Sequence, residues 1–271
     1  MLVAMRVAAV QMSSQDDPSQ NLARVRALVG EAAGAGAEVI ALPENFAFFG
    51  PEEMKRTVAE ELERPGPIVT CLQELAALYR VALIAGGMPE KSQDPLRPYN
   101  TSVLVDRGGR ISARYRKVHL FDVSLSDGTE ARESAATLAG DQPVVCEVLG
   151  TLLGMTVCYD LRFPELYRSL GEKGARVITV PAAFTLTTGK DHWHVLLRAR
   201  AIENQVFVVA PAQHGKHPRG RQTYGKSLIV DPWGDVLAQA GEGEGFALAR
   251  LDFAYQDRVR AQLPCLQHRR F

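Results

Sequence analysis

Short apolar segments rich in β-branched residues alternate with amphipathic segments of helical period, and this alternation constrains the fold more than any other feature of the sequence. It is typical of α/β proteins, in which helices cover a β-sheet. In the first part of the chain, the segments that we predict as strands are 5–10, 38–42 and 81–85. The segments that we predict as helices there are 18–34, 51–62 and 67–79.

Two predicted hairpins interrupt the alternation. Residues 100–106 and 110–117 are extended runs around a Gly-Gly turn, and a second hairpin is expected over 144–158 with its turn at Gly150. Hairpins bring antiparallel strands into the structure, so they exclude a simple all-parallel sheet. No Ser/Pro/Gly-rich linker and no internal repeat divides the 271 residues. We therefore predict one layered α/β domain over residues 1–271.

After the second hairpin the alternation resumes, which extends the same architecture to the end of the chain. The helices predicted in this part are 164–173, 191–204 and 254–262. The strands predicted in this part are 176–181, 205–210, 224–230, 236–240 and 246–251.

Composition excludes several classes of protein. Lys and Arg together number 31, as do Asp and Glu, and the resulting net charge of zero argues against general nucleic-acid binding. No apolar run approaches the ~18 residues of a membrane helix. The apolar stretch 1–12 is interrupted by Arg6 and lacks a signal-peptide cleavage site, so we interpret it as the first buried strand. We expect a cytoplasmic protein that binds neither nucleic acid nor membrane.

The four cysteines are too few and too widely spaced to form a disulfide scaffold, a zinc ribbon or a thioredoxin motif. We expect at least three of them to be small buried hydrophobes. His192 and His194 lie two positions apart on a predicted helix and so face different ways, which makes them a poor metal pair. The cysteines are Cys71, Cys146, Cys158 and Cys265.

Three polar residues each follow a predicted strand, namely Glu44, Lys117 and Cys158. Ligands of α/β proteins collect beyond the carboxyl ends of strands, so these three side chains can converge on one site. The alternative is that polar residues simply begin where strands end. For any one of the three residues taken alone, that alternative is the stronger one.

Cys158 lies in a segment predicted to run from strand through a sharp turn into helix. A nucleophile at such an elbow is exposed beside backbone N–H groups that can hold an oxyanion. Its thiolate needs a nearby base or cation. A Cys–His pair is one possibility, although none of the six histidines lies in a protease signature. A Cys–Lys–Glu set is also sufficient, because Lys stabilises the oxyanion while Glu carries the proton to a leaving amine.

Three sequence blocks resemble the signature blocks of the nitrilase superfamily of carbon–nitrogen hydrolases, and in particular its Nit-type branch. The blocks are Leu42–Phe46, Tyr115–Phe121 and Cys158–Glu165, and their order and spacing also fit. The resemblance implies a four-layer αββα sandwich that pairs into αββα–αββα homodimers or multiples of dimers. It implies no cofactor and no metal.

The resemblance also implies the roles of the site residues. Cys158 is expected to be the nucleophile, Glu44 the general base, and Lys117 with the backbone N–H of Tyr159 the oxyanion donors. For a fourth, acidic residue we choose Glu133. Glu130 competes with it, because the loop 124–133 has Ser126-Asp-Gly128 where relatives have a Pro-Gly turn.

The implied reaction is hydrolysis of the amide bond of a small α-keto acid amide. Deaminated glutathione is the first expectation for the substrate, and α-ketoglutaramate is the alternative. A non-catalytic interaction protein on the same scaffold and a Cys–His protease or transferase also remain open. Because all three positions of the Glu–Lys–Cys set are filled, the sequence favours an enzyme over a binding module.

An anionic substrate of this kind needs positive charge in the pocket, and Arg162 is the nearest candidate to the nucleophile. It can equally pair with Asp160 or Glu165. For Arg198 and Arg200 we favour a structural role in helix pairing or at a dimer interface. Phe184 and Thr185 are expected to line the pocket, although Phe184 can also belong to the core.

Overall fold

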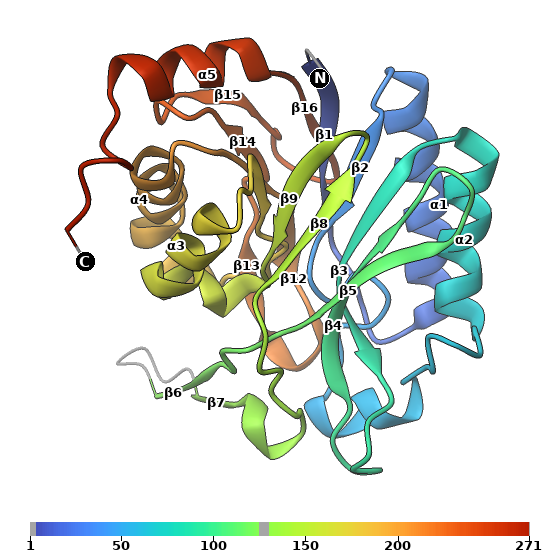
Figure 1. Ribbon diagram of the computed structural model, residues 1–271. Coiled ribbons are helices and arrows are strands. Elements are labelled where there is room, and N and C mark those ends of the chain that lie inside the picture. The colour runs from blue at the N-terminus through green and yellow to red at the C-terminus, as the bar shows by residue number, and fades with distance from the viewer. Residues whose placement is uncertain (1–3, 125–129, 271) are drawn as a thin grey trace.

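The computed structural model describes residues 4–124 and 130–270. Two mixed β-sheets face one another, and helices cover the outer face of each, so the layers run helix, sheet, sheet, helix (Figure 1). This arrangement confirms the predicted αββα sandwich. Residues 1–3 of the predicted first strand and the turn Ser126-Asp-Gly128 lie outside the described residues.

The first sheet is built around the N-terminal strand β1 (Ala4–Met12), which pairs in parallel with β2 and β12 and antiparallel with β16. The predicted first hairpin forms its β4–β5 edge. The other strands of this sheet are β2 (Val39–Leu42), β3 (Ala82–Glu90), β4 (Tyr99–Val105), β5 (Ile111–Arg116), β12 (Ala212–Lys216), β13 (Gln222–Tyr224) and β16 (Gly245–Asp252).

The second sheet contains the predicted second hairpin, in which Leu149 and Gly150 form the turn with φ values of 49° and 79°. Its strands, in spatial order, are β15 (Val236–Gln239), β14 (Leu228–Val230), β11 (Phe207–Ala210), β10 (Val177–Thr179), β9 (Thr151–Met155) and β8 (Val144–Val148). A separate two-stranded sheet consists of β6 (Asp122–Ser124) and β7 (Glu130–Arg132).

Two helices cover the outer face of each sheet, and a fifth follows β16 (Figure 1). Apolar side chains of α1 and α2 form one buried cluster with the first sheet, while a second cluster fills the space between the sheets and under α4. The α-helices are α1 (Pro18–Gly34), α2 (Pro67–Tyr79), α3 (Pro164–Glu172), α4 (Leu186–Asn204) and α5 (Phe253–Gln262). The 3₁₀ turns are η1 (Glu52–Thr57), η2 (Glu133–Ala135), η3 (Cys158–Arg162) and η4 (Pro218–Gly220).

The helix predicted over 51–62 is wrong, because only the six-residue 3₁₀ turn η1 forms there. The residues after η1 contact the start of α2 instead of forming a helix. The Glu60 carboxylate accepts hydrogen bonds from the backbone N–H groups of Gly66, Ile68 and Val69. These donors lie at the start of α2 and have no partner within that helix, so Glu60 caps α2 instead of continuing η1.

Two further boundaries differ from the prediction. The strand expected over 224–230 is two strands, because Gly225 and Lys226 have φ values of 71° and 59° and turn the chain from one sheet to the other. Helix α4 begins at Leu186 rather than at 191, where the Thr185 hydroxyl accepts a hydrogen bond from the Thr188 N–H. The residues 186–190 are mostly polar, so they lack the apolar periodicity from which a helix is predicted.

The expectation that at least three cysteines are small buried hydrophobes is only partly met. Cys71 is buried in the α2 core, whereas Cys146 and Cys265 are half-buried. All four cysteines are free thiols. Within residues 4–124 and 130–270, no helix combines the length and the apolarity that crossing a membrane demands.

The close approach of the two sheets at Gly86 gives a test of the packing. A Cβ atom at Gly86 would lie 1.9 Å from the Cβ of Pro181, so Gly86→Ala forces the segments apart. We expect it to lower the free energy of unfolding by about 1–3 kcal/mol or more. Gly34→Ala is the matched control, because nothing lies within 4 Å of its added Cβ and the helix gains stability. Equal midpoints of denaturant unfolding for the two variants would contradict this packing.

Candidate active site

The structure brings together Glu44, Lys117 and Cys158, the three polar residues that follow predicted strands. Glu44 lies two residues after β2, Lys117 directly follows β5, and Cys158 opens η3 after β9. The Lys117 Nζ lies 2.9 Å from Glu44 Oε1. Cys158 lines the same cavity as these two residues, and the Ala183 N–H donates to Glu44 Oε2 at 3.1 Å. Both sheets thus contribute to one buried cluster.

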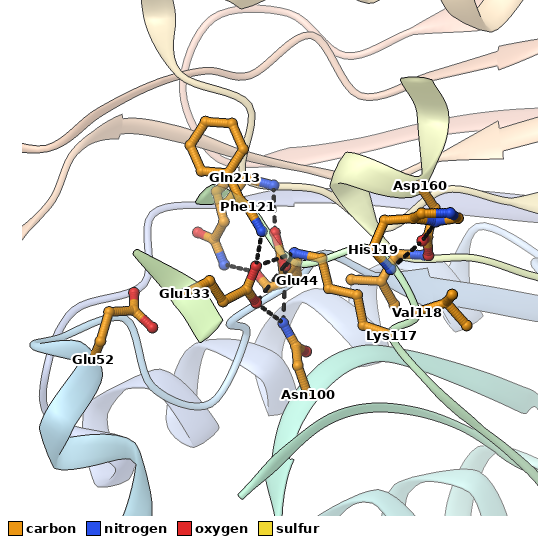
Figure 2. A network of polar contacts seen from close by, with 12 residues as sticks. Glu44, Glu52, Asn100, Lys117, Val118, His119, Phe121, Glu133, Asp160 and Gln213 are labelled. Atoms are coloured by element: carbon orange, nitrogen blue, oxygen red, sulfur yellow. Dashed lines mark hydrogen bonds and ion pairs between the residues drawn. The ribbon is translucent and has the colours of Figure 1, made fainter. Parts of the chain in front are cut away.

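A second carboxylate, that of Glu133, completes this cluster. Its Oε2 lies 2.9 Å from Lys117 Nζ and accepts a hydrogen bond of 2.7 Å from the Phe121 N–H. The Asn100 amide donates to both carboxylates, at 3.0 Å to Glu44 and 3.1 Å to Glu133 (Figure 2). One ammonium and one amide therefore hold two carboxylates side by side.

Glu130, the competing candidate for the fourth acidic residue, has a different place. It lies exposed on β7 at the rim of the cavity, whereas Glu133 is 6% exposed and contacts Lys117 directly. Of the two glutamates, Glu133 is therefore the one that belongs to the buried cluster.

The charges of the cluster support one another. Burial by itself lowers the pKa of Lys117, but the carboxylates of Glu133 and Glu44 outweigh it and hold that pKa well above its usual value. Burial likewise raises the pKa of Glu133, but Lys117 and Lys55 outweigh it and the net shift is downward. Lys117 is therefore a permanent cation and Glu133 a permanent anion near neutral pH.

The thiol of Cys158 is held in its neutral form. Burial raises its pKa well above the usual value, the Glu44 carboxylate raises it further, and Lys117 opposes both. A neutral thiol near a carboxylate can act as a nucleophile with that carboxylate as its base, and it loses its proton only when an electrophile arrives.

The backbone at Cys158 has the sharp turn that the sequence predicts. Its φ of 51° is in the left-handed region, and its N–H donates to the Pro181 carbonyl at 2.8 Å. Buried Asp160 fixes the turn by accepting hydrogen bonds from the Val157 N–H at 2.8 Å and the Tyr115 hydroxyl at 2.7 Å. Strain of this kind persists only where the surroundings hold it, and it clusters at functional sites.

Several residues that support the site were not predicted. Asn100 bridges the carboxylates, Asp160 fixes the turn, and Gln213 on β12 donates from its Nε2 to the Glu44 carbonyl at 2.9 Å. Asn100 and Gln213 lie inside strands rather than after them, and Asp160 lies two residues beyond Cys158 in the same turn. Only the pairing of distant segments shows what they do.

The cluster opens into a cavity of about 920 Å³. Phe184 and Thr185 line it, as predicted, and so do Tyr159 and Arg162. Phe184 also packs against Trp193 at a ring distance of 4.9 Å, so it belongs to the cavity wall and to the core at once. The volume is at the upper end of the range for small-molecule sites.

Arg162 does not form the alternative pair with Asp160 or Glu165; among the described residues its polar contact is His192 Nδ1 at 3.3 Å. Its guanidinium lies 5.3 Å from the Phe184 ring centre and 5.9 Å from that of Tyr159. Arg200 is buried and donates to the Leu161 carbonyl. Arg198 donates to the Gly234 carbonyl. Neither Arg198 nor Arg200 lines the cavity, so both make structural contacts as expected.

The part of the chain that the structure describes contains no group of three or more His, Cys, Asp or Glu side chains arranged to hold a metal ion. The polar groups around the cavity are instead those of acid–base and nucleophilic chemistry.

A buried Glu–Lys–Cys cluster on an αββα sandwich defines a class of enzymes that cleave carbon–nitrogen bonds. The family model "Carbon-nitrogen hydrolase" matches residues 6–261, and the chain belongs to this family. It is a hydrolase of the amidase type.

Individual relatives are similar to the chain in sequence or in structure. The chain is 47% identical to a deaminated glutathione amidase of Synechocystis, with 97% of each chain covered. The structure of Nit3 of Saccharomyces cerevisiae, a member of branch 10 of the nitrilase superfamily, is similar with a TM-score of 0.90, 32% identity and coverage of 99% and 97%. An amidase from Nesterenkonia sp. AN1, in a Glu-to-Gln variant with acrylamide added to its active-site cysteine, is similar with a TM-score of 0.80, 29% identity and coverage of 97% and 99%.

The effect of Glu44 on the thiol gives a test of the electrostatics. Glu44→Gln removes the negative charge beside Cys158, so we expect the pKa of the thiol to fall. The measurement is the pH dependence of iodoacetamide alkylation at Cys158, read by mass spectrometry, with Glu130→Gln as the control on the exposed rim. A thiol pKa that is unchanged in Glu44→Gln would show that the carboxylate does not act on the sulfur.

Proposed function

We propose that this chain hydrolyses the amide bond of deaminated glutathione through a thioester on Cys158. The observation that carries the proposal is that Glu44, Lys117 and Cys158 line one cavity, with Glu44 Oε1 at 2.9 Å from the Lys117 ammonium. Glu44 takes the thiol proton as the sulfur attacks the amide carbon, and a C–S bond forms. Lys117 and the backbone N–H of Tyr159, which follows the nucleophile at the start of η3, stabilise the oxyanion.

The same carboxylate completes both halves of the reaction. Protonated Glu44 passes its proton to the leaving amine as the C–N bond breaks, which leaves the acyl group on the sulfur. Glu44 then takes a proton from water as the water adds to the thioester. The C–S bond breaks, the thiol regains its proton, and the acid product leaves. Glu133 keeps Lys117 in place by its contact of 2.9 Å.

The proposed substrate carries a carboxylate on its α-ketoglutaryl half, and we assign Arg162 to it. Arg162 lies four residues after the nucleophile and lines the cavity. Charge-assisted hydrogen bonds of this kind are about twice as strong as neutral ones. Phe184 and Thr185 complete the wall beside it.

We also propose that the chain works as a homodimer, or a multiple of dimers, in the cytoplasm. The outer face of α4 and the turn beside it expose three large apolar side chains: Val195 at 66%, Ile202 at 45% and Trp233 at 53%. Water-exposed apolar patches mark protein–protein contacts. A reducing compartment also suits a free nucleophilic thiol.

The covalent step has a direct test. Protein quenched with acid during turnover of deaminated glutathione should carry an α-ketoglutaryl adduct on the Cys158 peptide, detected by mass spectrometry. We expect Cys158→Ala to lose activity by several orders of magnitude and Lys117→Ala by about 10²–10³-fold. Cys146→Ala is the matched control and should keep full activity. Turnover by Cys158→Ala would refute the scheme.

The substrate has its own test, in which α-ketoglutarate release is compared for deaminated glutathione and α-ketoglutaramate. We expect a higher kcat/KM for deaminated glutathione. Comparable or faster turnover of α-ketoglutaramate would instead assign the chain as an ω-amidase.

The oligomeric state is tested by light scattering after gel filtration. Val195→Asp places a charge in the apolar patch of α4, so we expect it to lower the mass to that of a single chain. Leu78→Asp, at an equally exposed site on α2, is the control and should leave the mass of the assembly unchanged. A single-chain mass for the unaltered protein would exclude the dimer.

A further inference from the structure

A second group of charged side chains lines the same cavity, and the proposed catalytic scheme does not use it. The group consists of Glu52, Glu53 and Lys55 from η1 together with Arg219 and Arg221 from and beside η4; we call it the η1–η4 wall. Figure 2 shows Glu52 on the side of Glu133 that faces away from Lys117. The η1–η4 wall therefore borders the cluster of Glu44, Lys117 and Glu133.

The charges of the η1–η4 wall do not cancel. Arg219 and Glu53 form a neutral pair at 2.9 Å, and both side chains are exposed. Glu52 is shared by two cations, with Lys55 Nζ at 2.8 Å from Oε2 and Arg221 Nη1 at 2.9 Å from Oε1. Within the wall three cations thus face two carboxylates, and Lys55 also interacts with Glu133 of the neighbouring cluster, which leaves Arg221 as the accessible cation of the Glu52 group.

The ion-pair cluster of Glu52, Lys55 and Arg221 lies where water has limited access. Lys55 is 5% exposed, and the Glu52 side chain is 26% exposed. An ion pair that is withdrawn from water interacts strongly with further charge, because the surrounding medium screens it little. The Arg221 side chain, at 37% exposure, is the most accessible of the three members of this ion-pair cluster.

Positive charge at this place fits the leaving half of the proposed substrate. Deaminated glutathione carries one carboxylate on each side of the amide bond to be cleaved: one on the α-ketoglutaryl half and one at the glycine end of the departing cysteinylglycine. α-Ketoglutaramate has only the first of them, because its leaving group is ammonia. With Arg162 assigned to the acyl half, the glycine carboxylate needs a second cation within the 920 Å³ cavity.

We propose that the η1–η4 wall, through Arg221 and supported by Lys55, binds the C-terminal carboxylate of the leaving group and so selects amides of dipeptides over primary amides. This subsite rests on the function proposed above. Arg221 is placed to act as a specificity-determining residue, because its guanidinium is held by Glu52 and by the Gly50 carbonyl and also faces the cavity. A guanidinium held in this way loses little further freedom on binding a carboxylate.

The test compares three substrates: deaminated glutathione, its analogue with a carboxamide at the glycine end, and α-ketoglutaramate. For Arg221→Gln we expect kcat/KM for deaminated glutathione to fall at least about tenfold, mainly through KM. The other two substrates should change less than about twofold. Arg221→Lys keeps the charge and should recover part of the loss.

Two further variants separate this subsite from general damage. Arg162→Gln should lower kcat/KM for all three substrates, because each carries the α-keto acid carboxylate. Arg26→Gln is the matched surface control, since Arg26 pairs with Glu74 at 2.8 Å outside the cavity, and it should change none.

The outcomes distinguish the subsite from the proposed function. If the unaltered enzyme hydrolyses deaminated glutathione and its carboxamide analogue with equal kcat/KM, the subsite is refuted while the amidase function stands. Equal losses for all three substrates in Arg221→Gln also refute it. Hydrolysis of α-ketoglutaramate alone refutes the proposed substrate and the subsite together.

Discussion

The buried ammonium of Lys117 between two carboxylates is the interaction on which the rest of the site depends. Removing charges from water is expensive, and a buried ion pair is tolerated only when its geometry is good and its remaining hydrogen bonds are satisfied. Here Glu44 and Glu133 lie within 2.9 Å of the same nitrogen, and Asn100 and the Phe121 N–H donate further hydrogen bonds to these carboxylates. The strands and turns around the cluster hold all of these groups at hydrogen-bonding distance, so the fold itself positions the charged side chains.

The sequence predicts the parts of the site that follow buried strands. Glu44, Lys117 and Cys158 stand after apolar segments, and such patterns locate the carboxyl edge of a sheet. Asn100 and Gln213 could not be found in this way, because each acts on a residue that is distant along the chain. Their roles depend on strand pairing and register, which the local sequence does not specify.

The errors in the predicted fold have the same origin. The segment 51–62 has a helical period, but the Glu60 carboxylate caps a neighbouring helix, and this tertiary contact outweighs local preference. β12, with the sequence Ala-Gln-His-Gly-Lys, lacks the apolar alternation of a strand. It is ordered because β1 supplies a parallel partner. The prediction of αββα layering is nevertheless correct, since the long apolar strands and amphipathic helices determine it.

The pairing of β1 with β16 has a consequence for how the enzyme is made. β1 pairs along eight positions with β16, which is synthesised much later, and β12, which carries Gln213, also pairs with β1. Until those late segments emerge, β1 presents an open edge, and open edges promote association between chains. Contacts of such long sequence separation also slow folding. The nascent chain therefore holds its nucleophile before the sheet that positions Glu44 is complete, because β12 and β16 are made after Cys158.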